Sequence, residues 1–164
     1  FQILVDTLLG TFVEPYKKRQ SRQVISKASK FYLFDVGIAG ALTKRFLEEE
    51  KGELFGKALE HFIFTEIKAF RSYRDLTFDI HFWRTKNGQE VDFILGNAEV
   101  AIEVKGSGKV DSRDLRHLTA FQEEFSPRQA IVVSNERNAR VVNKIRILPW
   151  RTFLEELWGE KIMR

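Results

Sequence analysis

The sequence predicts an α/β protein in which helices cover both faces of one mixed β-sheet. Three observations support this fold class. Residues 54–71 repeat apolar side chains at the spacing of a helix that buries one side. Residues 79–105 contain three short segments that alternate in polarity or are rich in β-branched residues, as strands are. Residues 129–133 form a continuous apolar run, which is typical of a strand covered on both faces.

The 164 residues suffice for one compact domain with an appendage. We place the boundary near residues 51–54, where an acidic segment ends in glycine before the strong helical pattern begins. Residues 1–52 then form a small first module and residues 53–164 the main domain. The chain begins at Phe1 inside an apolar run, so we expect it to be excised from a longer protein.

The first module is expected to be a small α+β segment. Residues 1–10 have the pattern of the end of a helix, and residues 11–16 and 30–34 that of two strands. Asp35 is a plausible N-cap of a second helix over residues 38–49. A helix followed by two strands outlines the second half of a winged helix.

The loop between these two strands is basic. It contains Lys17, Lys18, Arg19 and Arg22, which are candidates for contacts with nucleic-acid phosphates. The alternative is a loop that only faces water, as most runs of charge do.

The main domain is predicted to run helix, three strands, helix, strand, strand, helix. Ser112 is the expected cap of the middle helix, and Ser126-Pro127 ends it. The expected elements are, in order, 54–71, 79–84, 91–95, 100–105, 112–125, 129–133, 144–148 and 151–158.

Charged residues stand inside two of these strands, which are joined by a turn at Gly96-Asn97. Side chains alternate between the two faces of a strand. On the first strand this alternation separates two sets: Glu90, Asp92 and Ile94, and Val91, Phe93 and Leu95. On the second strand it again separates two sets: Ala101, Glu103 and Lys105, and Ile102 and Val104.

Asp92, Glu103 and Lys105 could therefore converge, and Glu60 lies at the edge of the apolar side of the preceding helix. Strand interiors are depleted in such residues, and a buried carboxylate needs a cation or a donor. Two interpretations remain open: a divalent metal site, or carboxylates paired with Lys105 on a solvated sheet face. Glu60 could equally reach into the site or point to solvent.

Composition excludes several classes of protein. The absence of cysteine rules out disulfides and a thiolate zinc site, and the three histidines are scattered. No apolar run is long enough to cross a bilayer and no signal peptide is recognisable, so we expect a cytoplasmic protein without a membrane partner. The net charge of +4 mildly favours a nucleic-acid partner.

A phosphate-binding loop is not predicted. Residues 106–111, GSGKVD, resemble one superficially. The position of its first glycine is occupied by Glu103, however, and Val110 follows Lys109 where Ser or Thr would stand. We therefore expect no ATP site in this chain.

The order of acids and elements resembles the PD-(D/E)XK nuclease superfamily, which has the restriction-endonuclease-like fold. Glu60, Asp92, Glu103 and Lys105 stand at the positions of its motif, although the superfamily's Asp often follows a proline and here follows Val91. More narrowly, FYLFDVGIAGAL, GKALEHFIFTEI, FWRTKNGQEVDFIL and AIEVKGS are similar to the C-terminal domain that follows the ATPase module of many archaeal and bacterial AAA-type ATPases.

The resemblance implies a restriction-endonuclease-like core and Mg²⁺-dependent (or Mn²⁺-dependent) hydrolysis of DNA. Asp92, Glu103 and the Val104 carbonyl would bind the ion, Lys105 would orient or deprotonate water, and Glu60 would hold a second ion or one of its waters. It also implies an ATPase module upstream of Phe1, where any ATP would bind. The alternatives are an inert module of the same fold that binds DNA or a protein for an ATPase, and a domain that only forms homo-oligomers.

Overall fold

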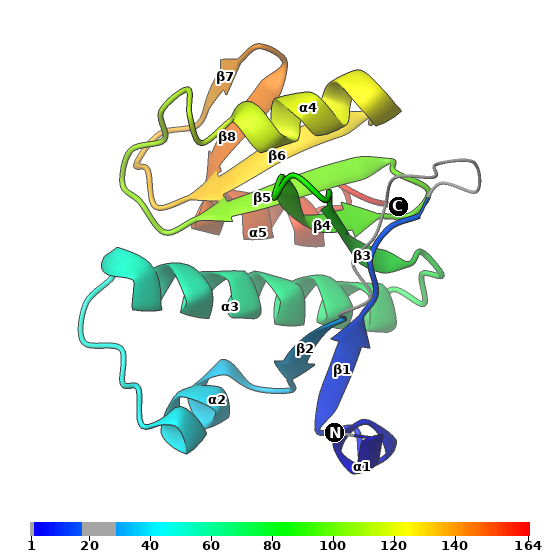
Figure 1. Cartoon of the computed structure of the whole chain (residues 1–164), viewed down its shortest axis with the longest axis vertical. Helices are drawn as coiled ribbons and strands as arrows, with labels where there is room; N and C mark the ends of the chain where they lie inside the picture. Colours follow the sequence, from blue (N-terminus) through cyan, green and yellow to red (C-terminus); the bar gives the residue numbers. More distant parts are fainter. Residues whose placement is uncertain (1, 18–28) are drawn as a thin grey trace.

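The computed structural model describes residues 2–17 and 29–164 (Figure 1). The elements are, in chain order, α1 (Gln2–Asp6), β1 (Gly10–Val13), β2 (Lys30–Leu33), α2 (Val36–Thr43), α3 (Gly52–Tyr73), β3 (Ile80–Arg84), β4 (Glu90–Leu95), β5 (Val100–Lys105), α4 (Arg116–Phe125), β6 (Gln129–Ser134), β7 (Arg140–Val142), β8 (Ile145–Pro149) and α5 (Trp150–Trp158).

The main domain is built on a six-stranded mixed sheet with the strand order β3-β4-β5-β6-β8-β7. Strands β3, β4 and β5 pair antiparallel, β5, β6 and β8 pair parallel, and β7 closes the far edge antiparallel to β8. The predicted mixed-sheet α/β fold is confirmed. The prediction missed β7, a three-residue edge strand that lies between two expected elements and is too short to show a period.

Helices cover both faces of this sheet (Figure 1). On one face, α3 and α5 bury a core that includes Ile63, Ile67 and Phe153 against the strands. On the other face, α4 buries Leu118 and Phe121. Strands β5 and β6 have buried residues facing both cores, which explains why β6 reads as an unbroken apolar run.

The first module contains the predicted helix, two strands and second helix. Strands β1 and β2 form a separate antiparallel sheet, and Pro15 bridges to Phe82 of β3. Asp35 caps α2 as expected, because its carboxylate accepts the N–H of Ile38 at 2.8 Å. Of the basic loop, Lys17 is exposed, whereas Lys18, Arg19 and Arg22 lie outside the described residues, so the winged-helix comparison stays a prediction.

Two helix boundaries differ from the prediction. Helix α2 ends at Thr43, because Lys44 takes a left-handed conformation (φ 54°) and caps it, instead of continuing to residue 49. Helix α4 begins at Arg116 and not after Ser112. A turn precedes α4, in which the carboxylates of Asp111 and Asp114 accept backbone N–H groups.

The helices of the described residues include none that is both long enough and apolar enough to cross a bilayer.

Candidate active site

The four residues selected from the sequence line one cleft. This cleft, of about 430 Å³, lies at the N-terminal end of α3, next to the end of β5. Helix α3 contributes Glu60, β4 contributes Asp92, and β5 contributes Glu103 and Lys105.

Two glycines bring the helix and the strand together at the cleft. A Cβ atom on Gly106, which follows β5, would lie 2.7 Å from the Cα of Gly56 in α3. Only a residue without a side chain allows this approach. The close packing of the two backbones fixes the distance between Glu60, one turn further along α3, and the carboxylates of the sheet.

A β-bulge in β4 corrects the predicted alternation of faces. The pairing of β3 with β4 shifts register in mid-strand. Phe93 and Leu95 pack in the core under α3, whereas Val91 and Ile94 pack in the core under α4. Asp92 and Phe93 therefore both lie on the α3 side, although strict alternation separated them. The bulge turns the Asp92 carboxylate into the cleft.

The bulge also interrupts the ladder between β4 and β5, whose last regular pair is Phe93 with Ile102. Beyond it, the Oδ2 atom of Asp92 accepts the backbone N–H of Val104 at 2.9 Å. The N–H and C=O of one strand residue point to the same side. The Val104 carbonyl thus faces the same interrupted edge, as a metal ligand would have to.

A lysine that the sequence did not select lies among the acids. The ammonium of Lys30, at the start of β2, is 3.0 Å from Glu60 Oε1, 2.8 Å from Glu90 Oε1 and 3.2 Å from Asp92 Oδ1. Burial alone would lower the pKa of Lys30, but the charges of Asp92, Glu60 and Glu90 outweigh burial and raise that pKa above its ordinary value.

Further partners hold two of these acids in place. The hydroxyl of Tyr32, also on β2, donates to Glu60 Oε1 at 2.5 Å, and burial beside this carboxylate raises the pKa of Tyr32. Arg84 lies 2.6 Å from Glu90 Oε2. Burial opposes the ionisation of Glu90, but hydrogen bonds and charges from Lys30 and Arg84 lower its pKa.

Glu103 is the least compensated acid. It is 4% exposed, and its Oε1 atom pairs with the Lys105 ammonium at 2.7 Å. Its Oε2 atom is buried and has no hydrogen-bond partner. Burial, together with the nearby charge of Asp92, raises the pKa of Glu103 far above its ordinary value. Burial and the charge of Glu60 likewise raise the pKa of Asp92.

These donors suit a Mg²⁺ ion that keeps several of its waters better than an ion enclosed by carboxylates alone. Among the described residues, no three Asp, Glu or His side chains are arranged to hold a metal ion. One buried oxygen, Glu103 Oε2, lacks a partner, while both oxygens of Asp92 already have one. Mg²⁺ commonly keeps several waters and takes one or two carboxylates. The residues present therefore fit an ion between Asp92 and Glu103. Its binding to Asp92 would replace the contact that Lys30 makes with the same carboxylate.

Sequence reasoning missed Lys30, Tyr32 and the role of Glu90. A signal was present, since Lys30 and Tyr32 are two residues apart on one strand and so share a face. Glu90 likewise shares a face with Asp92. No local pattern shows, however, that a strand 60 residues earlier in the chain lies over this hairpin.

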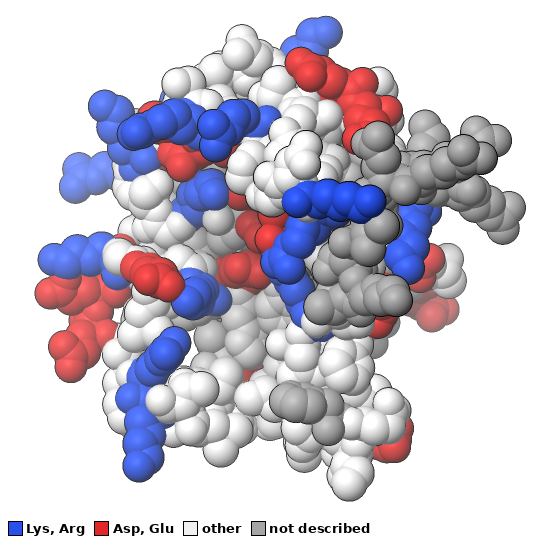
Figure 2. All heavy atoms as spheres, viewed as in Figure 1, with Lys and Arg blue, Asp and Glu red and all other residues white. Residues whose placement is uncertain are grey.

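A basic patch borders the cleft beyond Lys105. Figure 2 shows Lys and Arg side chains gathered over the loop between β5 and α4. We define the basic patch as the exposed residues Lys109, Arg113 and Arg116 of this loop and the start of α4, with Arg140, whose guanidinium donates to the Val110 carbonyl. Two of them have acidic partners, Arg113 with Asp111 and Arg140 with Glu136, each at 2.8 Å.

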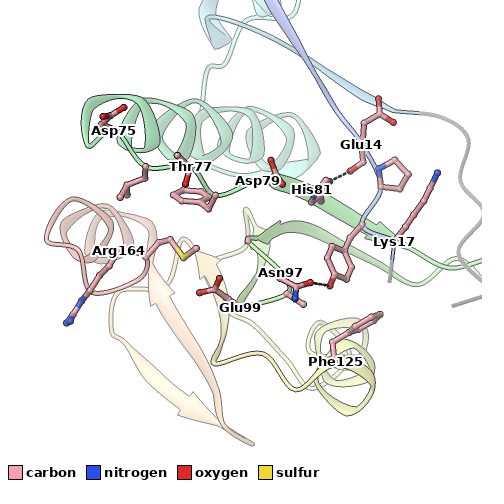
Figure 3. A pocket seen from close by; sticks show the side chains of 17 residues that line it. Glu14, Lys17, Asp75, Thr77, Asp79, His81, Asn97, Glu99, Phe125 and Arg164 are labelled. Atoms are coloured by element: carbon pink, nitrogen blue, oxygen red, sulfur yellow. Dashed lines mark hydrogen bonds between the residues drawn. The ribbon is translucent and has the colours of Figure 1, made fainter. Parts of the chain in front are cut away.

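A larger cavity lies elsewhere among the described residues. It measures about 1330 Å³ and lies near the C-terminal end of α3, between Asp75, Asn97 and Arg164 (Figure 3). The Tyr16 hydroxyl donates to Asn97 within it at 2.9 Å. Its acidic side chains, including Asp75, are all exposed. The smaller cleft is therefore the stronger candidate site, because its carboxylates are buried and their pKa values are raised.

Comparison with known proteins assigns a family without an activity. The model of a family described as "Domain of unknown function (DUF4143)" matches residues 55–153, which span α3 to the first turn of α5. None of the curated proteins and none of the solved structures matches the chain.

Proposed function

We propose that this chain, which belongs to the DUF4143 family, hydrolyses DNA phosphodiester bonds with Mg²⁺ at the cleft between α3 and β5. The observation that carries the proposal is the buried carboxylate of Glu103. One of its oxygens has no partner, and it lies beside Asp92 and Lys105 in a cleft. A buried carboxylate oxygen without a partner costs stability, so a bound cation accounts best for Glu103 Oε2.

The residues of the cleft would divide the work as follows. Asp92 and Glu103, with the carbonyl of Val104, would hold the ion. When bound, Mg²⁺ would polarise a phosphodiester oxygen and make water a better nucleophile. Lys105 would orient the attacking water through its ammonium and offset the negative charge that develops on the phosphate. Its contact with Glu103 keeps that ammonium at the ion site.

Two features support DNA as the substrate. The basic patch continues from Lys105 along the loop to α4, so a phosphate backbone could run from the patch across the cleft. The likeness of the four motif segments to nuclease-fold domains linked to ATPases points to the same substrate class. An ATPase module upstream of Phe1 belongs to this proposal as well.

A cleavage assay tests the proposal. Supercoiled, linear and single-stranded DNA are incubated with the protein in Mg²⁺ or Mn²⁺. We expect cleavage by the wild type and a loss of about 10²- to 10⁴-fold in Asp92→Asn and Lys105→Met. Lys161→Met is the matched control, because it removes the same charge from an exposed site outside the cleft. Wild-type protein that cuts none of these DNA forms in either metal would refute the proposal.

A second candidate function is a DNA-binding module without catalysis. The ion pairs of Lys30 favour it, since they provide Glu60, Glu90 and Asp92 with a cationic partner without any metal. In that case Lys109→Glu with Arg116→Glu should abolish DNA binding, whereas Asp92→Asn should leave it intact. Fluorescence anisotropy without divalent cations measures this binding. Together with the cleavage assay it separates the two functions, because only the nuclease needs Asp92 for turnover.

A further inference from the structure

The ammonium of Lys30 is fully coordinated by carboxylates. It has three N–H bonds, and three carboxylate oxygens lie within 3.2 Å of its nitrogen: Glu60 Oε1, Glu90 Oε1 and Asp92 Oδ1. These acids come from α3 and β4, while Lys30 comes from β2. The site is thus one cation surrounded by three acids from two other elements, and the chain itself supplies the cation.

The fold holds this lysine in place. Lys30 pairs with Val13 across the two-stranded sheet, and its side chain is 18% exposed. The ammonium also lies over the ring of Phe82, 5.5 Å from its centre. Tyr32, next on the same face of β2, donates to Glu60. A side chain with these contacts is a fixed part of the site and not a surface lysine that happens to lie nearby.

Charge balance indicates what the lysine replaces. Three carboxylates, Glu60, Glu90 and Asp92, face two cationic groups, Lys30 and Arg84. The group therefore carries one excess negative charge. Without Lys30 it would carry two, which one divalent cation balances. The present N···O distances suit an ammonium and are longer than the roughly 2.0–2.1 Å of a Mg²⁺–oxygen contact.

We infer that Lys30 is a built-in substitute for a second metal ion. Its ammonium fills the space between Glu60, Glu90 and Asp92, which are not arranged to hold a metal ion while it is there, and one exchangeable ion remains, between Asp92 and Glu103. The ion between Asp92 and Glu103 rests on the proposed function, whereas the role of Lys30 in place of a second ion does not. Glu60 is then a ligand of Lys30 and not of a metal.

Counting bound Mn²⁺ tests the inference. The number of ions bound per chain is measured for the wild type, Lys30→Met and Lys30→Arg by titration calorimetry and by the electron paramagnetic resonance of free Mn²⁺. Methionine keeps the unbranched stem and removes the charge, whereas arginine keeps the charge. We expect one ion in the wild type, two in Lys30→Met and one in Lys30→Arg. Adding Glu60→Gln to Lys30→Met should return the count to one.

The outcomes separate this inference from the proposed function. If the wild type binds no ion and Lys30→Met binds one, the Lys30 inference stands and the nuclease proposal fails. If both bind one ion, the inference fails and the nuclease proposal stands. A Lys30→Met protein that is unfolded without metal but folds in Mn²⁺ supports the inference, because an ion that binds only the folded state stabilises it. One that stays unfolded in Mn²⁺ overturns it.

Discussion

The side chain of Asp92 takes the place of a backbone partner for Val104. Its Oδ2 atom accepts the Val104 N–H at 2.9 Å, just where the bulge in β4 ends the regular ladder with β5. One carboxylate therefore completes the sheet with one oxygen and meets the Lys30 ammonium with the other. The structural and the proposed chemical role of Asp92 are carried by different atoms, so substitutions can separate them.

Asp92→Ala should destabilise the protein by about 1–3 kcal/mol more than Asp92→Asn. Asparagine keeps an oxygen that can accept the Val104 N–H, while alanine leaves this buried donor without a partner. Urea unfolding of both variants, followed by circular dichroism, measures the difference. Equal stability of the two variants would mean that the hydrogen bond to Val104 contributes nothing.

Glu103→Gln should stabilise the protein without metal, and more so at higher pH. The pKa of Glu103 is raised from 4.5 to about 8 by burial and by the charge of Asp92. A raised pKa means that its favourable contribution is complete below pH 4.5 and is lost as the pH rises through about 8. Glutamine cannot ionise, so the variant should exceed the wild type by about 1–3 kcal/mol near pH 8 and by little near pH 4.5.

Unfolding free energies at several pH values in chelator provide this comparison. Groups that titrate identically in both proteins cancel in the difference. A difference that stays flat from pH 4.5 to 8 would show that Glu103 ionises as it does in the unfolded chain.

Gly106→Ala should cost about 1–3 kcal/mol, because its Cβ would come within 2.7 Å of the Gly56 Cα and push α3 away from β5. Gly108→Ala is the matched control two residues later. There the new Cβ would meet only the Asn135 carbonyl oxygen, at an ordinary 3.8 Å. Thermal unfolding of the two variants gives the comparison, and equal melting temperatures would refute the tight contact between helix and strand.

The sequence predicted the elements whose patterns are local. The apolar stripe of α3 and the unbroken apolar run of β6 each follow from burial on one face or on two. The N-cap role of Asp35 and the placing of Glu103 and Lys105 on one strand were predictable for the same reason: each depends on neighbours within a few residues. Strand β7 is too short to show a period, and the start of α4 is a boundary that a periodic pattern does not fix.

The site was predictable only in part. The acids of β4 and β5 are out of place in strands, which is why they could be selected from the sequence. The bulge at Asp92 reverses the expected face of Phe93, and a bulge leaves no mark in an alternation pattern. Lys30 comes from a separate small sheet, and its contact with Glu60 depends on how that sheet packs on α3. Such long-range packing is not encoded in a local motif.

The central claim is that Asp92 and Glu103 bind one divalent cation. Crystals grown without metal and soaked in Mn²⁺ test it through an anomalous difference map. We predict one peak in contact with Glu103 Oε2 and an oxygen of Asp92, with Lys105 within hydrogen-bonding reach of a water on the ion. A map with no peak in this cleft, and with Glu103 still paired only to Lys105, would contradict the claim.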